Sequence, residues 1–300
     1  MSTLGRLVWV TGARGMLGSE LVRNLAVRGH EVLATGREAD IADRERLLVA
    51  LAGRRPRCII NAAAYTAVDL AESESTAAFR INAEGAGIIA ELARDIAADF
   101  VHVSTDYVFE GLHGEPIKED APLAPRGVYA QSKALGEARV LATIDAAHRV
   151  IVVRTSWLFG PHPRSFVARM LSLMARRETL DVVADQYGRP TAAVDLADVL
   201  VMLGIGELQT IPSGAYHFAN PGATTWHGFA TAIQAAARHH GQSLATTSIR
   251  PIATSAFPRP APRPAWSVLD CTTLERALAD CGRPARSWLS ALDELLGRAP

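Results

Sequence analysis

The chain has 300 residues, enough to bury a large core in one large domain or in a domain with an attached lobe. Its 31 basic and 31 acidic residues cancel, which gives no electrostatic reason to expect nucleic acid or an anionic membrane as a partner. Hydrophobic residues make up 49% and charged residues 21%, as in ordinary soluble globular proteins, and no apolar run approaches the ~18 residues of a membrane span.

The chain start and the cysteines predict a cytoplasmic protein. Residues 1–6 lead directly into an apolar run, without the charged and apolar leader of an exported protein. Cys58, Cys271 and Cys281 are odd in number and lack metal-ligand spacing, which favours reduced thiols over a disulfide framework.

The first half alternates strand-like apolar runs with helical patterns, which predicts a parallel sheet covered by helices on both faces. The expected strands are Leu7–Val10, Glu31–Ala34, Cys58–Asn61, Phe100–Ser104 and Val150–Arg154, and the expected helices lie near 16–28, 43–52, 76–96 and 129–145. Ligands bind at the carboxyl ends of the strands in such sheets. The residues at these ends, which locate the site, are Gly12, Asn61, Ser104 and Arg154.

Beyond residue 155 the pattern is looser. The expected helices lie near 164–177, 194–205, 225–239 and 286–296, with short strands at Leu180–Ala184 and Tyr216–Ala219. The fold class predicted is therefore α/β, a Rossmann-type doubly wound parallel sheet with a smaller C-terminal α/β substrate-binding lobe. The sheet domain is expected to span 1–155 with parts of 180–215, and the lobe 156–179 and 216–300.

Residues 251–264 carry five prolines, with Arg250, Arg259 and Arg263 beside and between them. So many prolines exclude a helix and predict an extended surface loop. The loop is either a plain linker or, through its arginines, a surface that faces an anionic ligand.

A glycine-rich turn joins the first strand to a helix. It reads Gly12-Ala13-Arg14-Gly15-Met16-Leu17-Gly18. A strand, a glycine turn and a helix in this order direct backbone N–H groups at a pyrophosphate. The spacing has one residue more before the second glycine than the Gly-x-Gly-x-x-Gly turn, but the need for a tight turn and close approach of the backbone is the same. We therefore expect Gly12, Gly15 and Gly18 to bind a dinucleotide.

The residues after the second strand bear on which dinucleotide binds. An acidic residue at the end of that strand would bind the ribose diol of NAD, but Gly36 and Arg37 stand there. Arg37 and Arg14 are placed to meet a 2′-phosphate, so NADPH is expected in preference to NADH, which is not excluded. The alternative is that both are solvated surface arginines. Asp40 is expected to reach the edge of the adenine.

A segment of small residues, Asn61-Ala62-Ala63-Ala64-Tyr65-Thr66, follows the third strand. Small side chains such as Ala63 and Ala64 let backbone amides and carbonyls lie against the cofactor, with Tyr65 and Thr66 near its nicotinamide end. Alanines that pack a helix onto the sheet would look the same. The position at the ligand-binding edge favours the functional interpretation.

Tyr129 and Lys133 are four residues apart on one expected helix and so share a face. A free tyrosine has a pKa of about 10, and a nearby ammonium lowers that pKa toward the range where general acid catalysis is efficient. Lys133 can also hold the ribose hydroxyls of the nicotinamide. Thr105 supplies a second donor for the alkoxide that forms when hydride adds to a carbonyl.

Together these residues resemble the extended short-chain dehydrogenase/reductase superfamily and, within it, the dTDP-4-dehydrorhamnose reductases. The segments that carry the resemblance run over nearly the whole chain: Asn61–Asp69, Ser104–Phe109, Arg154–Trp157, Asp185–Thr191, Tyr216–Asn220 and Arg263–Asp270.

The resemblance implies reduction of the C4 ketone of a dTDP-bound 6-deoxyhexulose by NADPH or NADH, with Thr105, Tyr129 and Lys133 catalytic. Asp106 and Trp157 would contact the sugar, although Trp157 also fits a core position. The residues that the resemblance implies for cofactor binding are Gly15, Met16, Leu17, Asp40, Ile41, Ala64, Tyr65 and Thr66. A dTDP-sugar is the implied small-molecule partner, and residues 1–155 become the NAD(P)-binding domain.

Some relatives in this branch are described as dimers bridged by a divalent metal through acidic residues. This chain has Ala192-Ala193-Val194 where the first of those residues is expected, which predicts no structural metal. The assembly is expected to be a monomer or a homodimer. Ala130 and Glu110 depart from the more usual glycine and aspartate, and neither touches the predicted chemistry.

Three other functions compete with this one. Related 4,6-dehydratases carry Thr-Asp-Glu, and Tyr107 replaces that glutamate here, so the base for dehydration is missing. A ketoreductase for another dTDP-deoxyhexulose in a natural-product pathway fits the sequence equally well. A non-catalytic relative serves as a regulatory subunit of methionine adenosyltransferase, but this chain retains Thr105, Tyr129 and Lys133.

Overall fold

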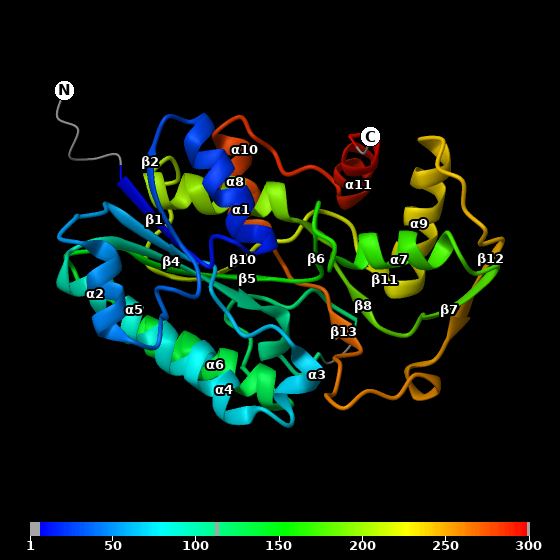
Figure 1. Ribbon diagram of the computed structural model, residues 1–300, viewed down its shortest axis with the longest axis horizontal. Coiled ribbons are helices and arrows are strands. Elements are labelled where there is room, and N and C mark those ends of the chain that lie inside the picture. The colour runs from blue at the N-terminus through cyan, green and yellow to red at the C-terminus, as the bar shows by residue number, and fades with distance from the viewer. Residues whose placement is uncertain (1–6, 112–113, 299–300) are drawn as a thin grey trace.

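A six-stranded parallel sheet forms the centre of the protein in the computed structural model, which describes residues 7–111 and 114–298 (Figure 1). Its strands are β1 (Leu7–Thr11), β2 (Glu31–Thr35), β3 (Cys58–Asn61), β4 (Asp99–Thr105), β5 (Val150–Thr155) and β10 (Gly214–His217). The order across the sheet is β10-β5-β4-β3-β1-β2, so the direction of winding reverses between β1 and β3. The α/β class is confirmed, and the five strands predicted for the first half are each found to within one residue at either end.

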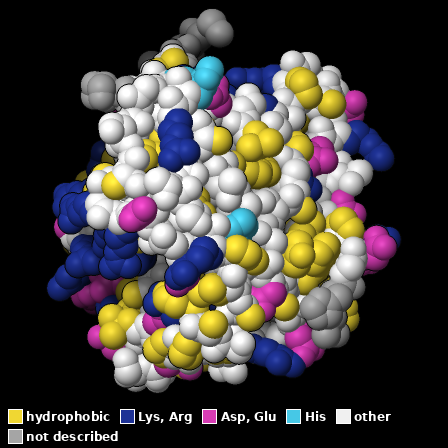
Figure 2. Space-filling view, turned by 90° about the vertical axis from the view of Figure 1, so that its right-hand side faces the viewer, with side chains coloured by type: hydrophobic (Ala, Val, Ile, Leu, Met, Phe, Trp, Pro, Cys, Tyr) yellow, Lys and Arg dark blue, Asp and Glu magenta, His cyan; other side chains and the backbone are white. Residues whose placement is uncertain are grey.

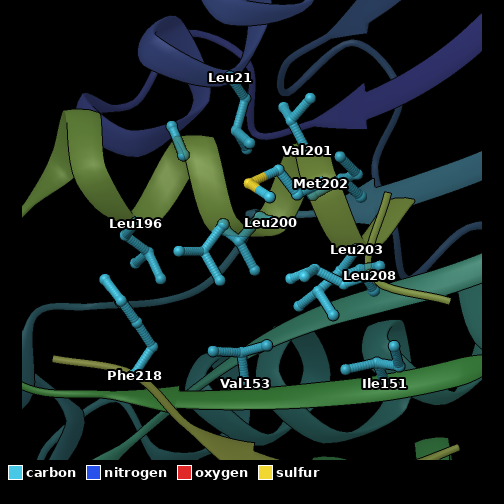
Figure 3. Packing of buried hydrophobic residues seen from close by; sticks show 14 of the residues in the cluster. Leu21, Ile151, Val153, Leu196, Leu200, Val201, Met202, Leu203, Leu208 and Phe218 are labelled. Carbon is cyan, nitrogen blue, oxygen red and sulfur yellow. The ribbon is translucent and has the colours of Figure 1, made fainter. Parts of the chain in front are cut away.

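Helices cover both faces of the sheet because alternate strand residues point to opposite sides. The helices on one face are α1 (Met16–Val27), α8 (Ala193–Ile205) and α10 (Thr272–Asp280), and those on the other are α2 (Arg44–Leu51), α5 (Ala86–Asp95) and α6 (Val128–Leu141). Figure 3 shows the first face, where Leu21 of α1 and Met202 of α8 pack above Val153 of β5.

A π-helical turn interrupts the helix predicted over 76–96. The chain runs through α3 (Val68–Ala71), α4 (Ser75–Phe79) and the π-helix η2 (Arg80–Gly85) into α5. Gly136 of α6 packs so closely on this turn that an added Cβ would lie 2.0 Å from the carbonyl oxygen of Asn82. Such π turns often accompany functional sites.

The lobe lies beyond the carboxyl ends of the central strands, at the right of Figure 1. Its helices are α7 (Phe166–Met174), α9 (Trp226–His239) and α11 (Trp288–Gly297), and its short strands are β6 (Leu158–Phe159), β7 (Thr179–Val183), β8 (Tyr187–Gly188), β9 (Thr191–Ala192), β11 (Thr224–Thr225), β12 (Ser248–Ile252) and β13 (Trp266–Ser267). Phe159, Phe229 and Trp288 anchor its separate core. The outer face of the lobe carries basic, acidic and hydrophobic side chains together (Figure 2), in keeping with the cancelling charges of the chain.

Two segments that lie wholly or partly within 216–300 pack with the sheet rather than with the lobe. The strand β10 pairs in parallel with β5 at the edge of the central sheet. Leu274 and Leu278 of α10, a helix that the sequence analysis does not predict, join the core over that sheet. The predicted lobe range of 216–300 therefore includes parts of the sheet layer. Local sequence patterns do not show this, because it depends on packing between distant segments.

The proline-rich stretch is extended as predicted, apart from a short 3₁₀ turn at Thr254–Ala256. Pro251 lies within β12, which pairs with β7 in a sheet of two strands among the described residues. Proline is tolerated in such edge strands.

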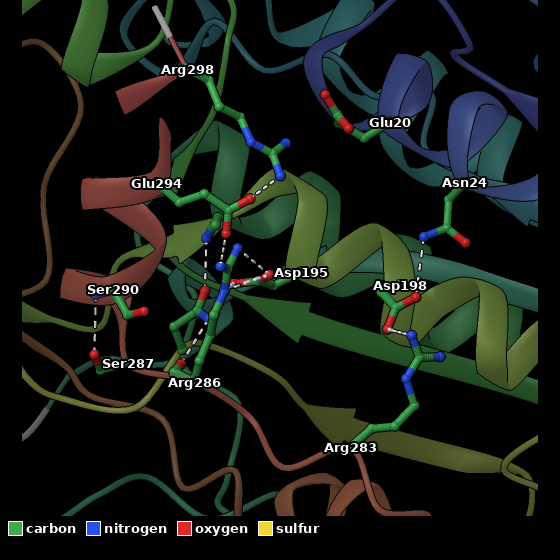
Figure 4. Close-up of polar contacts among 12 residues, drawn as sticks. Glu20, Asn24, Asp195, Asp198, Arg283, Arg286, Ser287, Ser290, Glu294 and Arg298 are labelled. Carbon is green, nitrogen blue, oxygen red and sulfur yellow. Dashed lines mark hydrogen bonds and ion pairs between the residues drawn. The ribbon is translucent and has the colours of Figure 1, made fainter. Parts of the chain in front are cut away.

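An ion-pair network links the C-terminal helix to α8. The guanidinium of Arg286 lies 2.9 Å from an Asp195 oxygen through Nε and also pairs with Glu294 (Figure 4). Asn220 donates to the same aspartate at 2.7 Å. These contacts fix the lobe against the sheet domain.

No helix among the described residues combines the length and the apolar character needed to cross a bilayer.

Candidate active site

The turn after β1 leaves no room for side chains at two of its glycines. At Gly12, where φ is +66°, an added Cβ would lie 2.6 Å from the nitrogen of Ala63, and at Gly18 it would lie 2.1 Å from the carbonyl oxygen of Gly12. Gly15 caps α1 and offers no side chain to the first N–H groups of that helix. The glycine turn thus leaves open space where side chains would otherwise lie, and the N–H groups at the start of α1 have no side-chain cap. Both features fit the pyrophosphate of a dinucleotide.

Met16 and Leu17 occupy the first turn of α1. Leu17 is buried in the core, and Met16 is half-buried with its thioether against Gly160. The structure therefore leaves Leu17 only its backbone to offer to a cofactor.

A carboxylate that the sequence analysis does not predict lies among the arginines after β2. Glu38 accepts the Gly36 N–H through Oε1 at 2.7 Å, and its Oε2 is 3.3 Å from Nη2 of Arg14. Arg14 is 80% exposed, and Arg37 is exposed as well. The acidic residue stands three positions beyond the end of the strand, which is why a search directly at the strand end misses it.

Asp40 and Ile41 lie where the chain turns toward α2. Asp40 accepts the Ala42 N–H at 3.0 Å and pairs with Arg80. Ile41 is buried, and an added Cβ at Gly85 would lie 2.7 Å from its Cγ1. The Ile41 side chain is thus part of the core, so only its backbone is available to an adenine.

The segment Ala63-Ala64-Tyr65-Thr66 leaves β3 at the same edge, with half-buried alanines and an exposed Thr66. Asn82 of η2 clamps the Tyr65 backbone: its Oδ1 accepts the Tyr65 N–H at 2.8 Å, and its Nδ2 donates to the Tyr65 carbonyl at 3.0 Å. The Tyr65 hydroxyl donates to Glu74 at 2.8 Å. Sequence reasoning misses Asn82 because it lies within a helical pattern.

Polar groups without partners lie at the end of β4. Thr105 donates to Oδ1 of Asp106 at 3.0 Å and accepts the Tyr107 N–H at 3.3 Å. The buried Oγ of Ser104 and Oδ2 of Asp106 have no hydrogen-bond partner among the described residues. Burial raises the pKa of Asp106 to about 6. Buried polar atoms without partners at a strand end fit a polar ligand such as a sugar.

Tyr129 lies at the start of α6, with its ring edge-on to Tyr107 at 5.6 Å between centroids. Burial raises the pKa of Tyr129 to about 12, and contact with the Thr105 hydroxyl offsets only part of that rise. The hydroxyls of Thr105 and Tyr129, the two predicted donors to a carbonyl oxygen, are thus in contact with each other.

The expected effect of Lys133 on Tyr129 is wrong for this structure. Lys133 Nζ donates to the Val103 carbonyl at 2.7 Å and lies 3.3 Å from Nε2 of His102. Lys133 does not lower the pKa of Tyr129; instead burial lowers the pKa of Lys133 itself to about 8. For Lys133, the cost of desolvating the ammonium outweighs its attraction to Glu137.

A buried ion pair fixes the helix that carries both residues. Arg154 at the end of β5 contacts Glu137 of α6 through Nε at 3.0 Å and Nη2 at 2.9 Å, and the two side chains are 5% and 1% exposed. Arg154 also donates to the Glu119 carbonyl at 2.9 Å. The sequence predicts Arg154 at the ligand-binding edge of the sheet, but it does not predict the ion pair with Glu137.

Trp157 follows β5 with a φ of +48°, a conformation that bulky residues rarely adopt. One face of its ring stacks on Trp226 at 3.7 Å, and Gly188 lies so near that an added Cβ would be 2.5 Å from its Cε2. The residue is half-buried, so it packs in the lobe while keeping part of its ring accessible. Its contact with a sugar stays a prediction.

The arginines of the proline-rich loop have acidic partners. Arg259 and Arg263 both pair with Asp69, at 3.0 and 2.9 Å, while Arg250 pairs with Asp181. Arg263 also lines a cavity of about 270 Å³ together with Tyr107. A larger cavity of about 610 Å³ lies between α1, α7 and α11 and includes none of the predicted catalytic residues.

Within residues 7–111 and 114–298, one group of three side chains has metal-ligand spacing. It consists of His239, His240 and Asp293, all exposed, in the lobe. The absence of a structural metal stays a prediction.

Residues 6–299 match the family model described as the RmlD substrate binding domain. The chain belongs to the RmlD family, the dTDP-4-dehydrorhamnose reductases. A dTDP-4-dehydrorhamnose reductase of Streptomyces griseus is 43% identical over 100% of this chain and 97% of its own length. A probable dTDP-4,6-dihydroxy-2-methyloxan-3-one 4-ketoreductase of Streptomyces antibioticus is 42% identical over 95% of this chain and 92% of its own.

The solved structures of RmlD proteins agree with this assignment. The dTDP-4-dehydrorhamnose reductase of Bacillus anthracis, crystallised in complex with NADP, is 33% identical and has a TM-score of 0.87. The match covers 98% of this chain and 100% of that one. The family resemblance drawn from the motifs is confirmed.

Proposed function

We propose that this protein reduces the C4 ketone of dTDP-4-dehydro-6-deoxy-L-mannose (dTDP-4-dehydrorhamnose) to dTDP-L-rhamnose, with NADPH or NADH as the reductant. The observation that carries the proposal is the contact of the Thr105 and Tyr129 hydroxyls at the end of β4, two strands from the glycine turn of β1. Two donors at one point can hold a single carbonyl oxygen.

The bound nicotinamide supplies the hydride that C4 receives. Tyr129 donates a hydrogen bond to the carbonyl oxygen, and so does Thr105 once its hydroxyl turns away from Oδ1 of Asp106. These bonds strengthen as negative charge develops on that oxygen. Tyr129 then gives its proton to that oxygen, so the ketone gains one hydride and one proton and becomes an alcohol. Asp106, with a carboxylate oxygen unpaired inside the site, is placed to hold a sugar hydroxyl.

The cofactor follows from the groups around the glycine turn. Gly12, Gly15 and Gly18 would admit the pyrophosphate, and Arg37 is available to a 2′-phosphate. Glu38 competes for Arg14, which supports use of NADH beside the preferred NADPH. A dinucleotide held there would extend along the strand ends toward Tyr129.

A second candidate is reduction of another dTDP-deoxyhexulose at C4. The Streptomyces antibioticus relative, named as a probable 4-ketoreductase for a different dTDP-sugar, is nearly as similar as the Streptomyces griseus reductase. A non-catalytic binding role is less well supported, because Thr105, Tyr129 and Lys133 are all retained.

The proposed compartment is the cytoplasm, and the proposed assembly is a monomer or a homodimer. Cys58, Cys271 and Cys281 are free thiols in the structure, as expected where thiols stay reduced. Light scattering distinguishes the two assemblies.

A coupled assay tests the proposed reaction. The 4-keto-6-deoxy-L-sugar nucleotide is generated in situ, reduced with NADPH or NADH, and the product is identified by NMR. The expected product is dTDP-L-rhamnose, formed faster with NADPH. If this substrate is left unreduced and a 2-deoxy analogue is consumed, the second candidate replaces the first.

A further inference from the structure

Three buried polar side chains line up across the sheet beneath Lys133. The strand register pairs Thr11 with Asn61 and Asn61 with His102, so all three point to the same side. Thr11 donates to Oδ1 of Asn61 at 2.7 Å, and Nδ2 of Asn61 lies 3.0 Å from Nδ1 of His102. Nε2 of the same ring is 3.3 Å from Nζ of Lys133. The chain of contacts therefore ends on the predicted catalytic lysine.

The Ala63 backbone fixes which way the Asn61 amide faces. Its N–H donates to Oδ1 of Asn61 at 3.1 Å, and a backbone N–H can only donate. The amide nitrogen therefore faces His102, and an NH₂ group also can only donate. It follows that Nδ1 of His102 accepts and carries no proton.

The His102 ring is then neutral, with its proton on Nε2. Burial, and Lys133 when it is an ammonium, keep the pKa of His102 well below its usual range, in agreement with a neutral ring. The N–H of Nε2 is directed at Nζ of Lys133. An ammonium has three donors and no acceptor, whereas a neutral amine has a lone pair that accepts this N–H.

Two further charged groups act around Lys133. Glu137, one turn along the same helix, favours the ammonium, but Arg154 of β5 holds that carboxylate in a buried ion pair. The Val103 carbonyl accepts from Nζ in either protonation state. Burial of Nζ acts in the same direction as the His102 contact.

We propose that His102, held in its Nε2–H tautomer by Asn61, is a positioning residue that fixes Nζ of Lys133 and favours the neutral amine over the ammonium. The effect on Lys133 does not depend on the proposed function.

The sequence allows a direct measurement, because Lys118 and Lys133 are its only lysines. Protein labelled with ¹³C and ¹⁵N lysine gives two side-chain signals, and Lys118→Arg assigns them. Lys118 is exposed and serves as an internal reference. Titration from about pH 6 to about pH 10 reads the pKa of Lys133 without substrate or turnover.

The variant His102→Gln tests the proposal. A glutamine amide can turn its oxygen toward Nζ and accept from the ammonium, so the pKa of Lys133 is expected to rise by about one unit or more while that of Lys118 stays unchanged. His148→Gln is the matched control, since His148 is also buried but contacts Asp145. An unchanged Lys133 pKa in His102→Gln overturns the proposal.

A measurement on the unmodified protein covers the case in which His102→Gln does not fold. Histidine ¹⁵N shifts report the tautomer, and an NOE to Lys133 identifies the His102 ring. The expected result is a bare Nδ1 and a protonated Nε2. A proton on Nδ1 overturns the proposal, and neither experiment depends on whether the protein reduces the expected sugar.

Discussion

Replacing Glu137 with methionine is expected to destabilise the protein strongly. Methionine keeps the approximate length of the side chain but removes the acceptors of Arg154, which is 5% exposed. Removing one partner of a buried ion pair costs about 3–5 kcal/mol, since the remaining charge is left without compensation. In a protein of this size the loss corresponds to a fall in Tm on the order of 10 °C.

Urea denaturation followed by circular dichroism measures this loss as a lower midpoint with an unchanged slope. Arg250→Ala is the matched control, because Arg250 forms an ion pair with Asp181 on the surface, at 63% and 45% exposure. Such a pair contributes about 0–1 kcal/mol. If Glu137→Met costs no more than Arg250→Ala, the buried pair does not hold α6 in place.

Three other changes give clear expectations. Asp106→Asn should raise the free energy of unfolding at pH 7.5 by up to about 3 kcal/mol. Burial raises the pKa of Asp106 from 3.8 to about 6, so the unmodified protein loses stability as the pH rises through that interval. The stability gained by Asp106→Asn should therefore vanish below about pH 4. A gain that does not depend on pH would show that the buried charge of Asp106 is not its cause. Arg37→Ala should weaken NADPH binding more than NADH binding, and Glu38→Gln, which releases Arg14, should strengthen NADPH binding. Calorimetric titration measures both affinities. Equal changes for the two dinucleotides would show that these arginines do not bind the 2′-phosphate. EDTA should leave activity and size distribution unchanged, because residues 192–194 are Ala-Ala-Val, and a chelator-dependent shift in either would show a metal.

The sheet and the glycine turn could be predicted because their signals are local. Leu7–Val10 is a continuous apolar run, as buried parallel strands require, and the turn residue Gly12 follows after Thr11. Gly12 and Gly18 stand where the backbone admits no side chain, so the sequence pattern and the steric cause coincide.

The helix α10 lacks such signals, and so does the place of β10 in the central sheet, although a strand is predicted nearby at Tyr216–Ala219. In Thr272–Asp280 only a few apolar residues, among them Leu274 and Leu278, face the core, and the helix comes after a proline-rich loop. Gly214–His217 is short, and its place at the edge of the central sheet depends on pairing with a strand some 60 residues earlier.

The residues around the site that the sequence does not reveal act through contacts between distant segments. Asn82 and His102 meet Tyr65 and Lys133 only because the strands and helices pack in one register. The error over the pKa of Tyr129 has a similar origin. The spacing of Tyr129 and Lys133 predicts that an amine is near the phenol. The direction of the pKa shift, however, is decided by burial, which is a property of the folded chain.

The central claim is that Tyr129 gives its proton to the oxyanion that hydride addition creates. Single-turnover oxidation of NADPH, compared between the unmodified protein and Tyr129→Phe with the keto-sugar nucleotide in excess, tests it most directly. The account predicts a rate lower by about 10²-fold or more, with an unchanged Kd for NADPH. Oxidation at the unmodified rate by Tyr129→Phe would contradict it.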